Sequence, residues 1–525
     1  MRIDVKSIIL VFLMLALSLS VATNSLNGEV ENPTFKETAE PLNVILPIAD
    51  LNEPGFQEGS IFTDSTLSSG DYHSCAVLDD GSVSCWGYNG NGQLGDGTTT
   101  DRNTPTQTSS LGTGRTAVAI SSGGSHTCAV LDDGSVSCWG YNGNGQLGDG
   151  TTTQRSTSTQ TSSLGTGRTA VAISSGEDHT CAVLDDGSVS CWGYNGYGQL
   201  GDGTTTDRNT PTQTSSLGTG RTAVAISSGD SHTCAVLDDG SVSCWGYNGN
   251  FELGIGTNTY YYESPTQTSS LGTGRTAVAI SSGDSHTCAV LDDGSVSCWG
   301  YNGYGQLGDG TTANRSTPTP TSSLGTGRTA VAISSGWLHT CAVLDDGSVT
   351  CWGLNIAGQL GDGTTTNRTT PTQTSSLGSG RTAVAISSGS SWFTCVILDD
   401  GSVSCWGYNI YNQLGDGTTT SRTTPTQTSS LGTTTNPRNA ALSERDFDGD
   451  GILNIFDVHQ NLDYRESAIS SGYRHTCAIL DNGSVSCWGE NSDGRLGDGM
   501  LTDRSTPTQT SSLGTGRTAV AISSG

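Results

Sequence analysis

Residues 126–151 read HTCAVLDDGSVSCWGYNGNGQLGDGT, and this sequence recurs almost unchanged along the chain of 525 residues. Successive copies begin 53 or 54 residues apart, except that the last copy follows its neighbour after 82 residues. Repetition at such a period indicates a protein that is built by stacking one small structural unit. The first cysteine of each copy lies at Cys75, Cys128, Cys181, Cys234, Cys288, Cys341, Cys395 and Cys477.

Each repeat contains four short segments that suit β-strands. In the second copy, TAVAISS (116–122) alternates small and apolar residues, and HTCAVL (126–131) and SVSCWG (135–140) flank an Asp-Asp-Gly turn. Segments that resemble PTQTSS supply an outer strand. Strands this short bury a face only when neighbouring units stack, so the repeat predicts one four-stranded blade of an all-β propeller. An open β-solenoid is the competing interpretation, but solenoid coils repeat over shorter stretches.

The 16 cysteines occur two per repeat, always ten positions apart. An Asp-Asp-Gly loop with its glycine in the left-handed region forms a type I turn followed by a G1 bulge. That register places Leu78 opposite Ser82 and Cys75 opposite Cys85, and directly opposed strand residues are close enough for a disulfide. We therefore predict eight disulfides, each within one hairpin: Cys75–Cys85, Cys128–Cys138, Cys181–Cys191, Cys234–Cys244, Cys288–Cys298, Cys341–Cys351, Cys395–Cys405 and Cys477–Cys487.

A histidine two positions before the first cysteine raises the alternative of a metal site. His73, Cys75 and Cys85 would offer three ligands, whereas structural zinc takes four, usually from Cys-x-x-Cys pairs that this chain lacks. The seventh repeat also has Phe393 at the histidine position. We expect these histidines to pack between blades, because near-uniform repetition suits packing rather than a single active site.

The N-terminal residues predict a secretory signal. Arg2 and Lys6 lie before the apolar run IILVFLMLALSLSVA at residues 8–22, which is shorter than the roughly 20 residues of a membrane span. We predict a signal peptide at 1–22, a poorly ordered lead-in at 23–65, and a secreted or cell-surface protein with no membrane span after signal removal. An uncleaved anchor is the alternative. The net charge of -28 disfavours nucleic acid as a partner.

The repeat motif, H-x-C-A-x-x-x-D-G-x-V-x-C-W-G-x-N-x-x-G-Q-L-G-D-G, resembles the regulator of chromosome condensation repeat family over residues 66–435 and 466–525. This resemblance implies a seven-bladed propeller with four-stranded blades. The best-known members exchange nucleotide on a small nuclear GTPase and bind chromatin, whereas others, including secreted bacterial inhibitors, use the propeller only for recognition. This chain departs from the nuclear members in its signal peptide, its paired cysteines and its acidity, so no exchange-factor residues are carried over.

The start of the first and eighth repeats bears on the number of blades. Both lack the GRTAV lead-in that every internal repeat has. We therefore expect residues 66–435 to close as a seven-bladed propeller, 436–465 to form an acidic linker, and 466–525 to begin a second, truncated propeller. The alternative is one eight-bladed ring, in which the last strand completes the first blade and the insertion is a loop.

The linker contains a candidate calcium loop. Its sequence DFDGDGILNIFD (446–457) follows the Asp-x-Asp-x-Asp-Gly pattern, in which a glycine allows a sharp turn and oxygens surround a hard cation. It resembles the calcium loops of dockerin-like and thrombospondin type 3-like repeats. The shorter aspartate at the last position weakens bidentate closure. We predict structural calcium bound by Asp446, Asp448, Asp450, the backbone carbonyl of Ile452, Asn454 and Asp457.

The repeats differ mostly in their loops, and this favours a binding function. Aromatic and apolar residues stand at these positions and could contact an extracellular protein or a glycan. An enzyme such as a hydrolase or lyase needs a unique cluster of titratable groups, and no such motif is found. Nucleotide exchange rests on family analogy alone. The variable positions include Asn91, Tyr197 and Tyr304, residues 257–262, Trp337, Leu338, Ile356, Ile410 and Tyr411.

Overall fold

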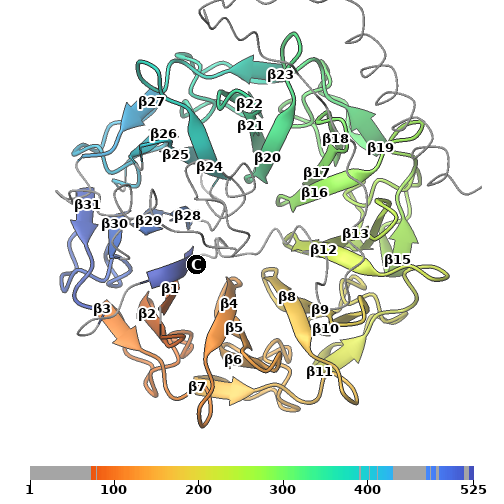
Figure 1. Cartoon of the computed structure of the whole chain (residues 1–525), viewed down its shortest axis with the longest axis vertical. Coiled ribbons are helices and arrows are strands. Elements are labelled where there is room, and N and C mark those ends of the chain that lie inside the picture. Colours follow the sequence, from red (N-terminus) through yellow and green to blue (C-terminus); the bar gives the residue numbers. More distant parts are fainter. Residues whose placement is uncertain are drawn as a thin grey trace, which may run out of the picture. The chain divides into compact units, whose positions relative to one another are not determined.

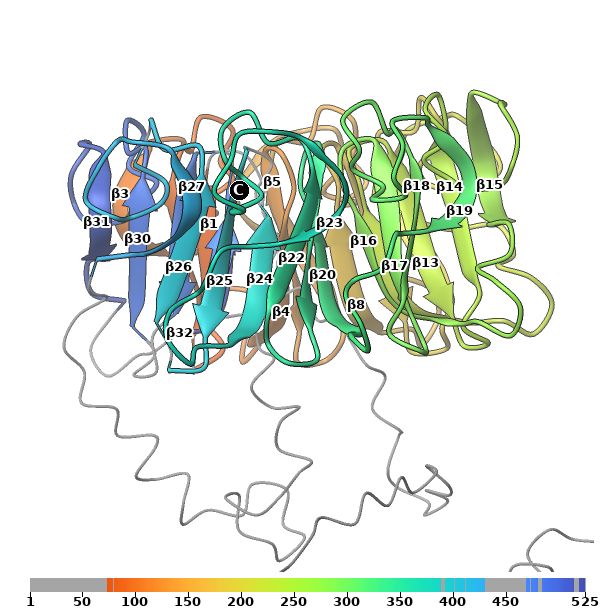
Figure 2. The same ribbon diagram turned by 90° about the horizontal axis from the view of Figure 1, so that it is seen from above.

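The computed structural model describes residues 73–78, 80–388, 392–400, 402–410, 412–429, 469–472, 474–479, 484–513 and 519–524. All of them lie in one compact unit, Gly59–Gly525. Within it the described residues form eight four-stranded antiparallel sheets, arranged as blades around a central axis (Figure 1). The strands run across the thickness of the ring from one face to the other (Figure 2). No helix among these residues has the length and apolar character that spanning a membrane requires.

Each blade contains an inner strand near the axis, a second strand, a third strand and an outer strand. The inner strands are β4 (Ala117–Ser122), β8 (Ala170–Ser175), β12 (Ala223–Ser228), β16 (Ala277–Ser282), β20 (Ala330–Ser335), β24 (Ala383–Ser388), β28 (Ile469–Ser471) and β32 (Ala519–Ser524). The second strands are β1 (His73–Leu78), β5 (His126–Leu131), β9 (His179–Leu184), β13 (His232–Leu237), β17 (His286–Leu291), β21 (His339–Leu344), β25 (Phe393–Leu398) and β29 (His475–Ile479).

The third and outer strands complete the blades. The third strands are β2 (Val83–Gly87), β6 (Val136–Gly140), β10 (Val189–Gly193), β14 (Val242–Tyr247), β18 (Val296–Gly300), β22 (Val349–Gly353), β26 (Val403–Gly407) and β30 (Val485–Gly489). The outer strands are β3 (Arg102–Gln107), β7 (Arg155–Gln160), β11 (Arg208–Gln213), β15 (Tyr261–Gln267), β19 (Arg315–Pro320), β23 (Arg368–Gln373), β27 (Arg422–Gln427) and β31 (Arg504–Gln509).

One ring of eight blades replaces the expected seven-plus-one arrangement, and that prediction is wrong. Blade 1 consists of β1–β3 and takes its inner strand from the other end of the chain, because β32 pairs antiparallel with β1. Blade 8, β28–β31, lies beside it in the same ring. The first repeat lacks a GRTAV lead-in because the last repeat supplies its inner strand. Blades 2 to 7 are β4–β7, β8–β11, β12–β15, β16–β19, β20–β23 and β24–β27.

The hairpin between second and third strands has the register that the sequence predicts. Cys75 is opposite Cys85, and the backbone N–H of Leu78 donates to the carbonyl of Ser82. Gly81 adopts a φ of 72°, the left-handed conformation that this turn requires. All eight expected disulfides are present, with the paired Cα atoms 4.1 Å apart.

The hydrophobic core lies between neighbouring blades rather than within one. Each third strand contributes a fully buried tryptophan, and Trp139 of blade 2 packs against the glycine-rich loop of blade 1. A Cβ atom on Gly95 in that loop would lie 2.9 Å from the Trp139 ring, so only glycine fits. Closure uses the same contacts, because Leu78 and Trp86 of blade 1 pack with Leu496 of blade 8 and Ala519 of β32.

Candidate functional site

In every blade whose inner and second strands are consecutive in the chain, the strand order places two connections on the same face of the ring. In blade 2 these are residues 123–125, between inner and second strands, and residues 141–154, between third and outer strands. We call this side the loop face. The opposite face carries the Asp-Asp-Gly hairpins, whose sequence hardly changes between repeats. Most of the variation among repeats therefore occurs on the loop face.

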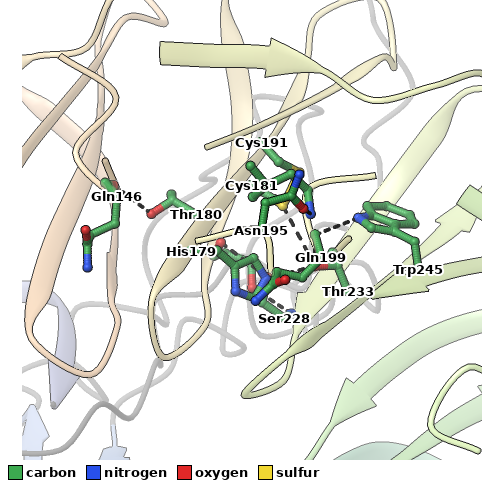
Figure 3. Close-up of a disulfide and its surroundings, with 12 residues drawn as sticks. Gln146, His179, Thr180, Cys181, Cys191, Asn195, Gln199, Ser228, Thr233 and Trp245 are labelled. Atoms are coloured by element: carbon green, nitrogen blue, oxygen red, sulfur yellow. Dashed lines mark hydrogen bonds between the residues drawn. A yellow bond between two sulfur atoms is a disulfide. The ribbon is translucent and has the colours of Figure 1, made fainter. Parts of the chain in front are cut away.

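A belt of buried histidines joins the blades beneath the loop face. His179 Nε2 lies 2.9 Å from the Thr233 hydroxyl of the next blade, and Thr180 donates its hydroxyl hydrogen to the carbonyl of Gln146 (Figure 3). Because each threonine hydroxyl is already a donor, the histidine must donate from Nε2. At the closure of the ring, His475 of blade 8 contacts the hydroxyl of Ser74 at 2.8 Å.

This environment makes the histidines poor acids and bases. Burial, with a smaller contribution from the neighbouring His126 and His232, lowers the pKa of His179 to about 3. The Nδ1 atom of His179 is buried and has no hydrogen-bond partner. An imidazole that is sealed between blades and neutral at physiological pH cannot shuttle protons to a bound molecule. The belt is structural, as the repetition predicts, and Phe393 takes its place in blade 7 with no exposed surface.

The aspartate of each glycine-rich loop is held by an internal network. Asp149 accepts hydrogen bonds from the backbone and hydroxyl of Thr151, and its second oxygen pairs with Arg155 Nε at 2.6 Å. Asn142 donates to the same carboxylate and to two carbonyls of the loop. Burial opposes ionisation, but the bonds from Thr151 and Arg155 leave the pKa of Asp149 lowered overall. These aspartates are therefore loop-forming residues that are already neutralised by arginine.

Blade 4 replaces this network as a unit. Ile255 takes the aspartate position and Tyr262 the arginine position, and both pack against the hydrophobic core. Glu252 takes the position that is glutamine in six of the other blades and Arg495 in blade 8, and its side chain is fully buried. Burial, together with the negative charge of Asp284, raises the pKa of Glu252 to about 7, although bonds from Asn250 partly offset this. Glu252, Ile255 and Tyr262 therefore give the loop face a different shape and charge at this blade.

Four tyrosines form a cluster on the loop face where blades 3 and 4 meet. The ring centroids of Tyr197 and Tyr247 are 5.1 Å apart, and those of Tyr247 and Tyr260 are 4.9 Å apart, both edge to face. Tyr194 contacts Tyr197 in the same manner. Tyr260 is 54% exposed, so its ring is available to a ligand.

A second aromatic group follows on blades 5 to 7. Trp337 stacks on Trp392 with centroids 5.7 Å apart, and Trp392 meets Tyr408 edge to face. The indole N–H of Trp337 donates to Asp284 of the preceding blade at 3.0 Å. Three further residues belong to this second group and are exposed at their loop tips: Tyr304, Ile356 and Ile410. We call the tyrosine cluster and this second group together the aromatic arc.

The structure brings together several residues that the sequence singled out separately. Tyr197, Tyr304, Trp337, Ile356 and Ile410 all lie on the loop face. Sequence reasoning missed Trp392, Asp178 and Asp207, although Trp392 is the one tryptophan at a position that holds Ser, Asp, Tyr, Leu or Arg in the other repeats. The predicted signal peptide, the lead-in, Tyr411 and the calcium ligands Asp446, Asp448, Asp450, Ile452, Asn454 and Asp457 lie outside the described residues.

The cysteines are not available as metal ligands, because all of them are paired in disulfides. Within the part of the chain that the structure describes, no group of three or more His, Cys, Asp or Glu side chains is arranged to hold a metal ion. The described residues of the loop face present aromatic rings and carboxylates, which can stack on and pair with a ligand.

Comparison with known proteins identifies relatives of the repeat. The profile of the RCC1-like domain matches residues 37–330 and 216–525. The ultraviolet-B receptor UVR8 of Arabidopsis thaliana is 32% identical over 394 residues, which cover 75% of this chain and 81% of that protein. The human E3 ubiquitin-protein ligase HERC2 is 33% identical over 65% of this chain, but the match spans only 7% of HERC2. The crystal structure of human WBSCR16 superposes with a TM-score of 0.56 at 19% identity, covering 69% of this chain and 95% of that one.

Proposed function

The chain belongs to the family of proteins with an RCC1-like domain, and from this premise we propose that it is a secreted or cell-surface recognition propeller. Its loop face binds an extracellular protein or glycan, and it catalyses no reaction. The aromatic arc carries this proposal, because its exposed rings are concentrated on blades 3 to 7. Aromatic side chains supply large contact areas at low entropic cost and dominate the energetics of protein interfaces.

Two further observations support an extracellular, non-enzymatic role. Structural disulfides are typical of oxidising compartments and rare in reducing ones, and residues 8–22 have the composition of a signal sequence. The described histidines of the belt are buried and repeated from blade to blade, whereas catalysis needs a unique, accessible set of groups. Calcium at residues 446–457 belongs to the same proposal as a structural ion, because secreted proteins use such loops to stiffen connections.

The test compares binding of the oxidised full chain and of loop-face variants to arrays of extracellular proteins and glycans. Tyr260→Gln and Trp337→Gly place on the arc the residues that blade 2 has at the same positions, Gln154 and Gly124. We expect each to abolish or weaken capture of the ligand. Arg168→Gln on the opposite face, where an exposed arginine pairs with Asp186, is the control that retains binding. Equal capture by all variants would reject the loop face as the binding site.

Export is tested separately by the mass of the secreted chain under non-reducing conditions. The proposal expects a chain that begins near Thr23 and lacks 16 hydrogens, one for each cysteine. An intact Met1 with free thiols would place the protein in a reducing compartment and favour an intracellular regulator of the kind that exchanges nucleotide.

A further inference from the structure

The electrostatic character of the aromatic arc narrows the class of ligand. Lysine is absent from residues 37–525, so arginine is the only strongly basic residue in the ring. On the loop face of blades 3 to 7, each described arginine at the start of an outer strand already pairs with the aspartate of its own loop. These pairs are Arg208 with Asp202, Arg315 with Asp309, Arg368 with Asp362 and Arg422 with Asp416.

Carboxylates beside the aromatic rings lack such partners. Asp178 and Asp207 are both near enough to Tyr194 for their charges to act on it, and neither has an ion-pair partner among the described residues. Asp207 accepts a hydrogen bond from the backbone N–H of Asn195 at 2.8 Å, and Asp178 accepts one from Gln146 Nε2 at 3.0 Å. Burial and the charge of Asp207 raise the pKa of Asp178, although the bond from Gln146 opposes this shift. The two negative charges therefore repel each other, and a bound cation would relieve the repulsion.

The same combination occurs at the tryptophan pair. Asp284 accepts the indole N–H of Trp337 and the hydroxyl of Ser285, and within the described residues no arginine pairs with it. Trp337 is 39% exposed, and this bond holds the Asp284 carboxylate at the edge of its ring. An aromatic face next to a carboxylate is the arrangement that attracts guanidinium and ammonium groups, through cation–π and ionic contact together.

We propose that the aromatic arc is the docking surface for a basic segment of a protein partner, in which arginine or lysine side chains stack on the tyrosine and tryptophan rings and pair with Asp178, Asp207 and Asp284. This inference rests on the proposed function and names its ligand class. A neutral glycan would use the rings but leave these charges unmatched. The positive charge of the partner matches a face whose own basic groups are already neutralised.

The direct test measures binding of a fluorescent peptide of repeated Arg-Gly-Lys-Ser units to the oxidised full chain. Its matched probe replaces arginine with citrulline and lysine with acetyl-lysine, which preserves the shape and removes the charge. We expect the charged peptide to bind, its affinity to fall as ionic strength rises, and the neutral peptide not to bind. Equal binding of both peptides, or no binding of the charged one, would overturn the inference.

Variants locate the site, and the repeats themselves supply substitutions that fold. Asp207→Asn copies Asn314 of blade 5, which accepts the same backbone hydrogen bond at 2.9 Å, and Tyr197→Asn copies Asn144 of blade 2. We expect each to weaken peptide binding by about fivefold. The control, Asp101→Asn in blade 1, removes the same charge and keeps the same loop bond, but it lies outside the arc.

The outcomes separate this inference from the proposed function. An equal loss of affinity in Asp101→Asn and Asp207→Asn would mean non-specific attraction to an acidic protein and would overturn the inference. The inference would also be overturned if the chain bound neutral oligosaccharides, if salt did not weaken that binding, and if Tyr197→Asn abolished it. In that case the loop face would stand as the binding site. If the loop-face variants changed no captured ligand at all, the proposed function itself would fail.

Discussion

At the scale of single residues, Glu252 makes the stability of blade 4 depend on pH. Its pKa is raised to about 7 by burial, against about 4.3 in an unfolded chain. The folded state therefore holds this proton more tightly, and the free energy of unfolding falls as pH rises from about 4.3 through 7. We predict that Glu252→Gln, which copies six of the other blades, stabilises the protein by about 2 to 4 kcal/mol at pH 8 and has little effect at pH 4.

Denaturant unfolding of both proteins at the two pH values measures this effect. Glu263→Gln on β15 changes the net charge equally and is the control, because its side chain is only partly buried. A stabilisation by Glu252→Gln that is the same at pH 4 and pH 8 would contradict the prediction.

The histidine belt predicts the opposite pH dependence. Burial lowers the pKa of His126 to about 3, whereas an unfolded histidine titrates near 6.5. The neutral histidine contributes fully to the free energy of unfolding above about pH 6.5. As pH falls from about 6.5 towards 3, this free energy decreases by about 1.4 kcal/mol per pH unit for each such histidine. His126→Phe, which copies Phe393 of blade 7, loses the bond to Thr180 and costs about 1 kcal/mol at pH 7. We expect this deficit to shrink or reverse at pH 4.5 in denaturant titrations, and a constant deficit would refute the argument.

Part of this residue-scale chemistry could be predicted from the sequence. The cysteine spacing was enough to pair all 16 cysteines, because the turn fixes the register of a single hairpin. The tyrosine cluster was not predictable, because Tyr197 and Tyr260 lie on different blades and meet only when those two blades pack side by side. Asp178 and Asp207 belong to two separate loops of blade 3, which only the antiparallel strand order brings to the same face.

At the scale of elements, the glycine-rich loop behaves as one interacting unit. Asp149 is buried and depends on Arg155 for its counter-charge, so Arg155→Tyr alone leaves an unpaired buried carboxylate and costs about 3 kcal/mol. Blade 4 shows the compatible double replacement, Ile255 with Tyr262. We predict that Asp149→Ile with Arg155→Tyr costs less than the sum of the single changes by more than about 1 kcal/mol. A double-mutant cycle by thermal unfolding measures this coupling.

The exposed arginine of the opposite face provides the comparison for that cycle. Arg168 pairs with Asp186 where both side chains are in contact with solvent, so Arg168→Ala is expected to cost less than about 1 kcal/mol. Additive effects in the Asp149 cycle would mean that the loop tolerates each substitution independently.

The strands themselves were largely predictable, because each segment is short, bounded by glycines and repeated. The outer strand begins earlier than expected, at Arg155 in blade 2, and ends before the Thr-Ser-Ser segment. In blade 2 the first residue of this strand, Arg155, is fixed by Asp149, a contact that spans six residues and has no periodic signature. Elements set by such loop contacts cannot be predicted from periodicity.

At the scale of the whole molecule, the number of blades could not be predicted from the repeat. Nearly identical blades pack in the same way in rings of different size, so the sequence of one blade does not determine how many blades the ring has. The missing GRTAV segments fit two separate propellers or one closed ring equally well. The structure selects the ring because β32 pairs with β1 and the His475–Ser74 contact joins blade 8 to blade 1.

The insertion between blades 7 and 8 predicts a calcium effect that is separate from the ring. We expect the oxidised chain to bind one calcium ion through residues 446–457, and Asp448→Asn to weaken that binding by at least about tenfold, because a charged ligand is lost. Calorimetric titration of chelator-treated protein measures both. Asp399→Asn, on an exposed hairpin far away in the sequence, is the matched charge control. Calcium binding that survives Asp448→Asn unchanged would place the ion elsewhere.

Ring closure predicts a specific defect when the last strand is lost. In the intact ring, Cys75 and Ala76 of β1 pair with Ser523 and Ile522 of β32. Removal of residues 519–525 deletes β32 and leaves this inner edge of β1 unpaired. An unpaired edge strand offers hydrogen-bonding groups to other chains, so we expect a lower melting temperature and oligomers in light scattering. Removal of Gly525 alone is the control, because β32 ends at Ser524. A truncated chain that stays monomeric and melts like the parent would mean that β32 does not stabilise the closed ring.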